Sequence, residues 1–149
     1  MSPLVLTGAV LDAARDFFEE RGANGCEGTA MIAGCDGVAT RLIIPDQVAS
    51  PVPSCWVEVT AAGKLELAAA LSPDERYVAR IHSHPALAFH SPTDDANPAL
   101  THDGAFSIVV PFFGLGLRRG LDACAVFVHE CGQWRELPPG PARESRIAG

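Results

Sequence analysis

The stretch from Tyr77 to Pro85 reads YVARIHSHP and carries the strongest structural signal in the sequence. Its apolar, β-favouring residues predict a buried strand from Tyr77 to His82, and Pro85 ends the strand because proline has no N–H to offer a neighbouring strand. Side chains at i and i+2 of a strand share a face, so His82 and His84 project side by side. Two imidazoles placed in this way are able to bind one metal ion.

A helix start follows at Ser91-Pro92-Thr93-Asp94. Ser91 is a typical N-cap, Pro92 loses no hydrogen bond in the first turn, and Asp94 falls at the third helical position. The two histidines with the Asp94 carboxylate form a set known from catalytic zinc sites, in which water takes the fourth position. These three residues alone leave a purely structural role for the histidines equally open.

Hydrolysis also requires a general base, and the candidate in the sequence is Glu27. It stands just before a predicted buried strand from Thr29 to Ala33, so its carboxylate can reach a site at the edge of the sheet. Taken alone, Glu27 is better interpreted as a solvated carboxylate of a loop.

Composition excludes several classes of protein. With 149 residues, 48% of them hydrophobic, the chain suits a single domain with one core, and its net charge of −7 argues against a nucleic-acid-binding surface. Five cysteines without a C-x-x-C pair fit neither a disulfide framework nor a cysteine-rich zinc site, and most are expected to be buried. The sequence shows neither a signal peptide nor a long apolar run, so we expect a cytoplasmic protein outside the membrane.

The remaining elements predict a mixed α/β (α+β) fold, with a central twisted mixed sheet flanked by helices. Apolar residues at helical spacing follow Thr7, and Gly22 is expected to end that helix in a left-handed conformation. A short helix is expected over Leu65 to Leu71. Residues 1–137 form the predicted domain, and residues 138–149, rich in Pro, Gly and charge, are expected to be a flexible C-terminal tail. Further strands are expected at Leu4–Leu6, Ala39–Ile44, Trp56–Thr60, Phe106–Val110, Ala123–His129 and Gln133–Leu137.

The combined motifs resemble the JAMM (MPN-type) metallopeptidases. That family has a Glu leading into a small-residue strand, then H-[ST]-H-P, then S-x-x-D, as at Glu27, His82 and Ser91 of this chain, and the resemblance extends from about Leu4 to Leu137. It implies a single MPN-like (cytidine-deaminase-like) domain with one catalytic Zn²⁺ held by two histidines and Asp94. It also implies that Glu27 moves protons and that Ser91 donates to the oxyanion.

One departure from the family concerns the third ligand. The interval from His84 to Ser91 is one residue shorter than in many relatives, so an ungapped alignment would select Asp95 instead of Asp94. We favour Asp94 because it lies one helical turn from Ser91. Adjacent helical residues point about 100° apart, so only one of the two carboxylates faces the metal.

The resemblance also implies a substrate, the C-terminal tail of a ubiquitin-like protein, cleaved at a peptide or isopeptide bond. The compact chain is similar to the short prokaryotic branch, which works beside activating and conjugating enzymes, in some cases in antiphage defence. Two alternatives are a non-catalytic MPN scaffold that binds a partner protein, and a peptidase that trims a sulfur-carrier protein. Trp56 and Phe89 are expected to pack in the core or at its rim. For Phe89, which lies between the two motifs, lining a substrate groove is the alternative.

Overall fold

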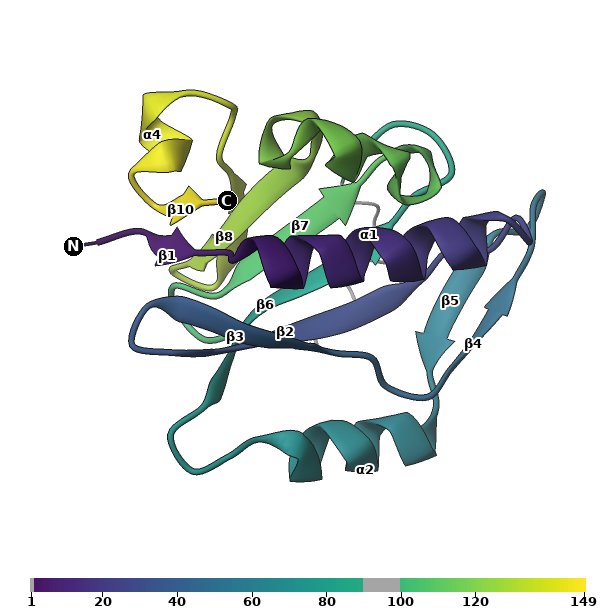
Figure 1. Ribbon diagram of the computed structural model, residues 1–149, viewed down its shortest axis with the longest axis horizontal. Coiled ribbons are helices and arrows are strands. Elements are labelled where there is room, and N and C mark those ends of the chain that lie inside the picture. Colours follow the sequence, from purple (N-terminus) through teal and green to yellow (C-terminus); the bar gives the residue numbers. More distant parts are fainter. Residues whose placement is uncertain (1, 90–99) are drawn as a thin grey trace.

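The computed structural model describes residues 2–89 and 100–149 (Figure 1). Ser91, Asp94 and Asp95 lie outside these residues. The helices are α1 (Gly8–Gly22), α2 (Ala61–Ala70), the 3-10 segments η1 (Phe112–Arg119) and η2 (Leu121–Ala123), and α4 (Pro141–Glu144). The strands are β1 (Leu4–Val5), β2 (Thr29–Cys35), β3 (Val38–Ile43), β4 (Gln47–Ser50), β5 (Trp56–Val59), β6 (Arg76–Ser83), β7 (Phe106–Val110), β8 (Ala125–Glu130), β9 (Gln133–Glu136) and β10 (Ile147–Ala148).

The main sheet has the strand order β10-β1-β3-β2-β6-β7-β8-β9, and β4 with β5 forms a separate hairpin. Strand β6 pairs antiparallel with β2 and parallel with β7, so the strand that carries the histidines lies inside the sheet. This arrangement confirms the predicted mixed α/β fold with a mixed sheet flanked by helices. Among the described helices, none is long and apolar enough to cross a membrane.

Helix α1 covers one face of the sheet (Figure 1). The Thr7 side chain accepts a hydrogen bond from the N–H of Val10, which confirms the predicted N-cap. The helix buries Val10, Ala14 and Phe18 against the sheet. The expectation for Gly22 is wrong: Gly22 is still helical, and Ala23 caps the helix in a right-handed conformation, its N–H bonded to the Glu19 carbonyl. The left-handed turn comes later, at Gly25.

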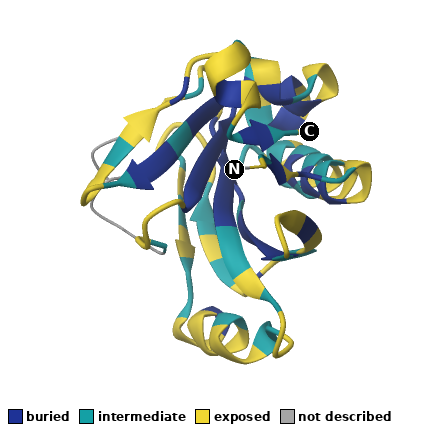
Figure 2. Cartoon of the chain, turned by 90° about the vertical axis from the view of Figure 1, so that its left-hand side faces the viewer, coloured by how far each residue is buried: buried dark blue, intermediate teal, exposed yellow. Residues whose placement is uncertain are grey.

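The two faces of β6 have different neighbours. Ala79 and Ile81 point into the hydrophobic core beneath α1, whereas Arg80 and His82 belong to the opposite face. Buried residues follow the central strands, whereas α2 is mostly exposed (Figure 2). Helix α2 is longer than expected because the Thr60 side chain caps it early, accepting from the N–H of Gly63.

The C-terminal segment corrects the expectation of a flexible tail. Strand β10 pairs in parallel with β1, which brings the two termini together, and Arg143 of α4 is buried with 2% of its surface exposed. Its guanidinium donates to the carbonyls of Leu137, Leu121 and Cys124. The expectation of a tail rested on composition, which does not show hydrogen bonds between distant residues. Only the tertiary structure brings Arg143 to the three buried carbonyls that it satisfies.

We expect Arg143→Ala to lower the free energy of unfolding by about 2–4 kcal/mol, because three buried carbonyl groups lose a charged donor. Urea unfolding followed by circular dichroism measures the change. Arg135→Ala is the matched control: Arg135 pairs with Glu130 at the surface, so its loss should cost less than about 1 kcal/mol. Equal effects of the two variants would show that the C-terminal segment is not anchored by Arg143.

Candidate metal centre

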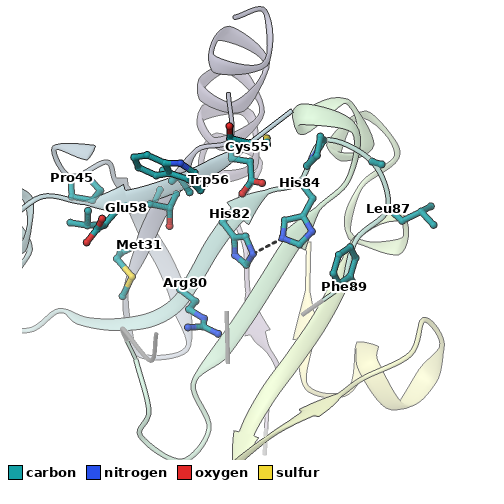
Figure 3. A pocket seen from close by; sticks show the side chains of 18 of the residues that line it. Met31, Pro45, Cys55, Trp56, Glu58, Arg80, His82, His84, Leu87 and Phe89 are labelled. Carbon is teal, nitrogen blue, oxygen red and sulfur yellow. Dashed lines mark hydrogen bonds between the residues drawn. The ribbon is translucent and has the colours of Figure 1, made fainter. Parts of the chain in front are cut away.

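His82 and His84 lie side by side on the face of β6 that is turned away from the core. Both side chains are buried, with 7% and 6% of their surface exposed. Their Nε2 atoms are 3.2 Å apart, and the pair is drawn at the centre of Figure 3. The prediction that the two imidazoles share a face is therefore confirmed.

The separation of the two nitrogens fits a shared metal ion. Two ligands at about 2.0–2.1 Å from a tetrahedral zinc are about 3.3–3.4 Å apart, close to the distance between these Nε2 atoms. Within residues 2–89 and 100–149, no three His, Cys, Asp or Glu side chains gather into a metal-binding group. The described residues thus include two of the three predicted metal ligands, and the third, Asp94, lies outside them.

Main-chain hydrogen bonds fix the position of His84. Its N–H donates to the carbonyl of Val110, and its carbonyl accepts from the N–H of Phe113. A neighbouring hydrogen bond joins the N–H of Phe112 to the carbonyl of Ala86. Phe112 and Phe113 both adopt left-handed φ values, 56° and 51°, which non-glycine residues rarely adopt. This strained turn directs two consecutive N–H groups at the end of the histidine strand.

Glu27 is held in the same region by the residues around it. Its carbonyl accepts from Nε of Arg21 at 2.9 Å. The following N–H, of Gly28, donates to the Ser83 hydroxyl at 2.9 Å, and Ser83 N–H donates back to the Gly28 carbonyl. A Cβ on Gly28 would lie 2.8 Å from the ring of Phe17, so only glycine permits this close approach to α1.

Glu27, His82 and His84 line one cavity of about 630 Å³. Its opposite wall is β5, from Trp56 to Val59, and its rim includes Leu87 and Phe89. Figure 3 shows Trp56 and Glu58 on one side of the histidine pair and Phe89 on the other. The structure thus brings the predicted base and the two predicted histidine ligands to one hollow in the surface.

Phe89 forms the wall of the cavity next to the histidine pair. Its ring lies edge-on to that of His84, with the ring centroids 4.8 Å apart, and half of the side chain remains exposed. Of the interpretations left open for Phe89, the structure favours the one in which it lines a groove. Trp56, expected in the core or rim, is half-exposed and belongs to the rim.

Three further residues at this site did not emerge from sequence reasoning. Ser83 lies between the histidines. Because successive side chains of a strand alternate between its faces, the sequence could have placed the Ser83 hydroxyl on the face opposite the histidines. Arg80 shares the histidine face, lines the cavity, donates to Ser107 and stacks over the Trp134 ring. Cys55 also lines the cavity, and its position depends on a loop that sequence patterns do not place.

Ser83→Ala should lower the free energy of unfolding by about 1–2 kcal/mol, because the buried N–H of Gly28 loses its acceptor. Denaturant unfolding of the metal-free protein measures this loss. The control is Ser145→Ala, which removes an exposed hydroxyl bonded to Ala142 and should change stability by less than about 0.5 kcal/mol. If Ser83→Ala behaves like the control, the hydroxyl does not hold the Glu27 turn.

Comparison with known proteins adds to this picture. No protein-family model matches the chain. Its structure is similar to that of a JAB1/MPN domain protein from Archaeoglobus fulgidus, with a TM-score of 0.50 and 16% identity, over 92% of this chain and 96% of that one. It is also similar to the solution structure of a protein from Desulfitobacterium hafniense, with a TM-score of 0.58 and 16% identity, over 90% and 89% of the two chains.

A curated relative is similar in sequence over part of the chain. A segment of 64 residues is 41% identical to a probable metalloprotease, y4jG, of Sinorhizobium fredii (strain NBRC 101917 / NGR234). The match covers 41% of this chain and 38% of that protein, so it spans well under half of the relative's length. The chain is therefore a protein of the JAB1/MPN fold, and its resemblance to the JAMM (MPN-type) metallopeptidases is confirmed.

Proposed function

We propose that this protein is a zinc-dependent peptidase that cleaves at the C-terminal tail of a ubiquitin-like protein. The observation that carries the proposal is the convergence of the His82 and His84 Nε2 atoms, 3.2 Å apart, in a cavity that Glu27 also lines. The fold of the JAB1/MPN proteins and the partial match to a probable metalloprotease support it.

Each residue then has a defined task. His82 and His84 would hold the zinc ion together with Asp94, and Ser91 would donate its hydroxyl to the carbonyl oxygen as that oxygen gains charge. A zinc ion supplies Lewis acidity toward water and toward the carbonyl. The Glu27 carboxylate takes a proton from the attacking water and passes it to the departing amine.

The cavity suits an extended peptide. All four residues of β5 line it, and within the described part of the chain β5 pairs with β4 alone. A substrate tail that adds as a strand to β5 would gain main-chain hydrogen bonds and run toward the histidines. The Phe89 ring stands against His84, which narrows the cavity there and favours small residues beside the bond that is cut.

The cellular setting is part of the same proposal. A bacterial ubiquitin-like conjugation pathway in the cytoplasm, with activating and conjugating enzymes as partners, would supply such tails, and antiphage defence is one role for it. A sulfur-carrier protein offers a similar tail and is the alternative substrate. A scaffold that binds a partner without cutting it is the alternative from a different class, and it has no need of stoichiometric zinc.

Removing the base should abolish cleavage. We expect the zinc-loaded protein to cut a ubiquitin-like protein fused to a C-terminal extension, and Glu27→Gln to lower kcat by about 100-fold or more. Intact-mass spectrometry of isopeptide-linked, extended and sulfur-carrier substrates measures rate and preference. Glu20→Gln, an exposed change on α1, is the control. Undiminished activity in Glu27→Gln would contradict the proposed role of Glu27 as the base.

Metal binding should depend on the histidine pair. The wild type is expected to bind one zinc per chain, and His84→Ala to weaken zinc binding by about 100-fold, because the ion loses one of its few ligands. Competition with a chromogenic chelator measures the affinity without any substrate. His102→Ala removes an exposed histidine and should bind zinc like the wild type. Equal affinities in all three proteins would place the zinc elsewhere.

A further inference from the structure

Large apolar side chains lie exposed beside the histidine pair, on the side away from β5. Leu87 is 69% exposed, and Phe89 is half-exposed. Both residues line the cavity, and Figure 3 shows them on the far side of the histidines from Trp56. Single exposed apolar residues are common on protein surfaces, whereas a group of them beside a cavity is a feature of binding sites.

Phe112 extends this apolar surface. Its N–H donates to the carbonyl of Ala86 at 2.9 Å, which places Phe112 next to the loop that carries Leu87. Its ring is half-exposed, and its φ of 56° lies in the left-handed region. Asn or Gly would adopt this backbone conformation at a lower cost, and burial does not compensate for the strain of the phenylalanine. Strain of this kind is concentrated at functional sites.

The position of this surface relative to β5 determines which part of a substrate reaches it. In the proposed function, the tail of a ubiquitin-like protein adds to β5 and runs toward the histidines. A polypeptide that is cut must extend on both sides of the bond, so the segment after the bond continues past His84. The ring of Phe89 lies edge-on to His84, with the centroids 4.8 Å apart, and Leu87 is two residues away along the chain.

We propose that Leu87, Phe89 and Phe112, which we call the Leu87 surface, bind an apolar side chain in the first two residues of the segment that is released. This inference rests on the proposed function. Hydrolysis adds the hydroxyl of water to the tail carbonyl and a proton to the amine of the released segment. The preferred substrates are then ubiquitin-like proteins with a peptide extension that begins with large apolar residues.

Two fusion substrates test the preference. A ubiquitin-like protein carries an extension that begins with either Leu-Leu or Asn-Asn, because Leu and Asn are similar in size and differ in polarity. The zinc-loaded protein should cleave the Leu-Leu fusion with a kcat/KM about tenfold higher, which is at the low end of what an apolar pocket discriminates. Intact-mass spectrometry measures both rates. Equal values of kcat/KM would overturn the inference.

Leu87→Ser tests the surface itself. This variant should lower the rate for the Leu-Leu fusion about fivefold more than the rate for the Asn-Asn fusion, because only the apolar extension loses a contact. Leu65→Ser is the matched control: Leu65 is 72% exposed on α2 and is not one of the described residues that line the cavity. The control should retain the tenfold preference, and a full preference in Leu87→Ser would contradict the proposal.

Phe112→Asn separates binding from folding. Asn tolerates the left-handed conformation, so the variant should unfold at nearly the same temperature as the wild type, while its preference for the Leu-Leu fusion falls. Thermal unfolding and the two cleavage rates measure these effects. A much lower unfolding temperature with an unchanged preference would show that Phe112 serves the fold alone.

Binding of the released segment is measurable without cleavage. With zinc added, the peptide Leu-Leu-Gly-Ser should shift the methyl NMR signals of Leu87, and Asn-Asn-Gly-Ser should leave them in place. If the wild type cuts neither fusion, the proposed function fails, and this titration still decides whether the Leu87 surface binds apolar side chains. If the signals respond to neither peptide, or move only with protein concentration as in contact between two copies, the inference is wrong.

Discussion

The candidate site depends on one pair of hydrogen bonds, exchanged between Ser83 and Gly28. Ser83, the last residue of β6, sits between the two histidines and is fully buried, and its hydroxyl and N–H both bond to the main chain of Gly28. Since Glu27 precedes Gly28 directly, this pair of hydrogen bonds fixes Glu27 relative to the histidines. Alternation along a strand makes the arrangement possible, because His82 and His84 then face the cavity while Ser83 faces the Glu27 turn.

The supports around this pair come from distant parts of the chain. Helix α1 contributes Arg21, which holds the Glu27 carbonyl, and Phe17, whose ring leaves room only for glycine at Gly28. The left-handed turn at Phe112 and Phe113 binds the end of the histidine strand from the other side. Rigid contacts of this kind, made to the residues of a site by their surroundings, hold reacting groups at a fixed distance from one another.

The cavity combines a polar centre with apolar walls. Glu27, His82 and His84 supply the polar groups, while half-exposed Trp56 and Phe89 offer apolar surface on either side. Such a hollow fits the extended peptide of the proposed function, with its backbone toward β5 and small side chains toward the histidine pair.

The sequence alone determined much of the fold and part of the candidate site. Local patterns predicted the strand of His82, the shared face of the histidines, the Thr7 cap and the mixed fold, because each depends on neighbouring residues. Only the tertiary structure decided that Arg143 anchors the C-terminal segment and that Ser83 bonds to Gly28. These contacts join residues far apart in the chain, and no local periodicity specifies which buried carbonyl or hydroxyl will meet which partner.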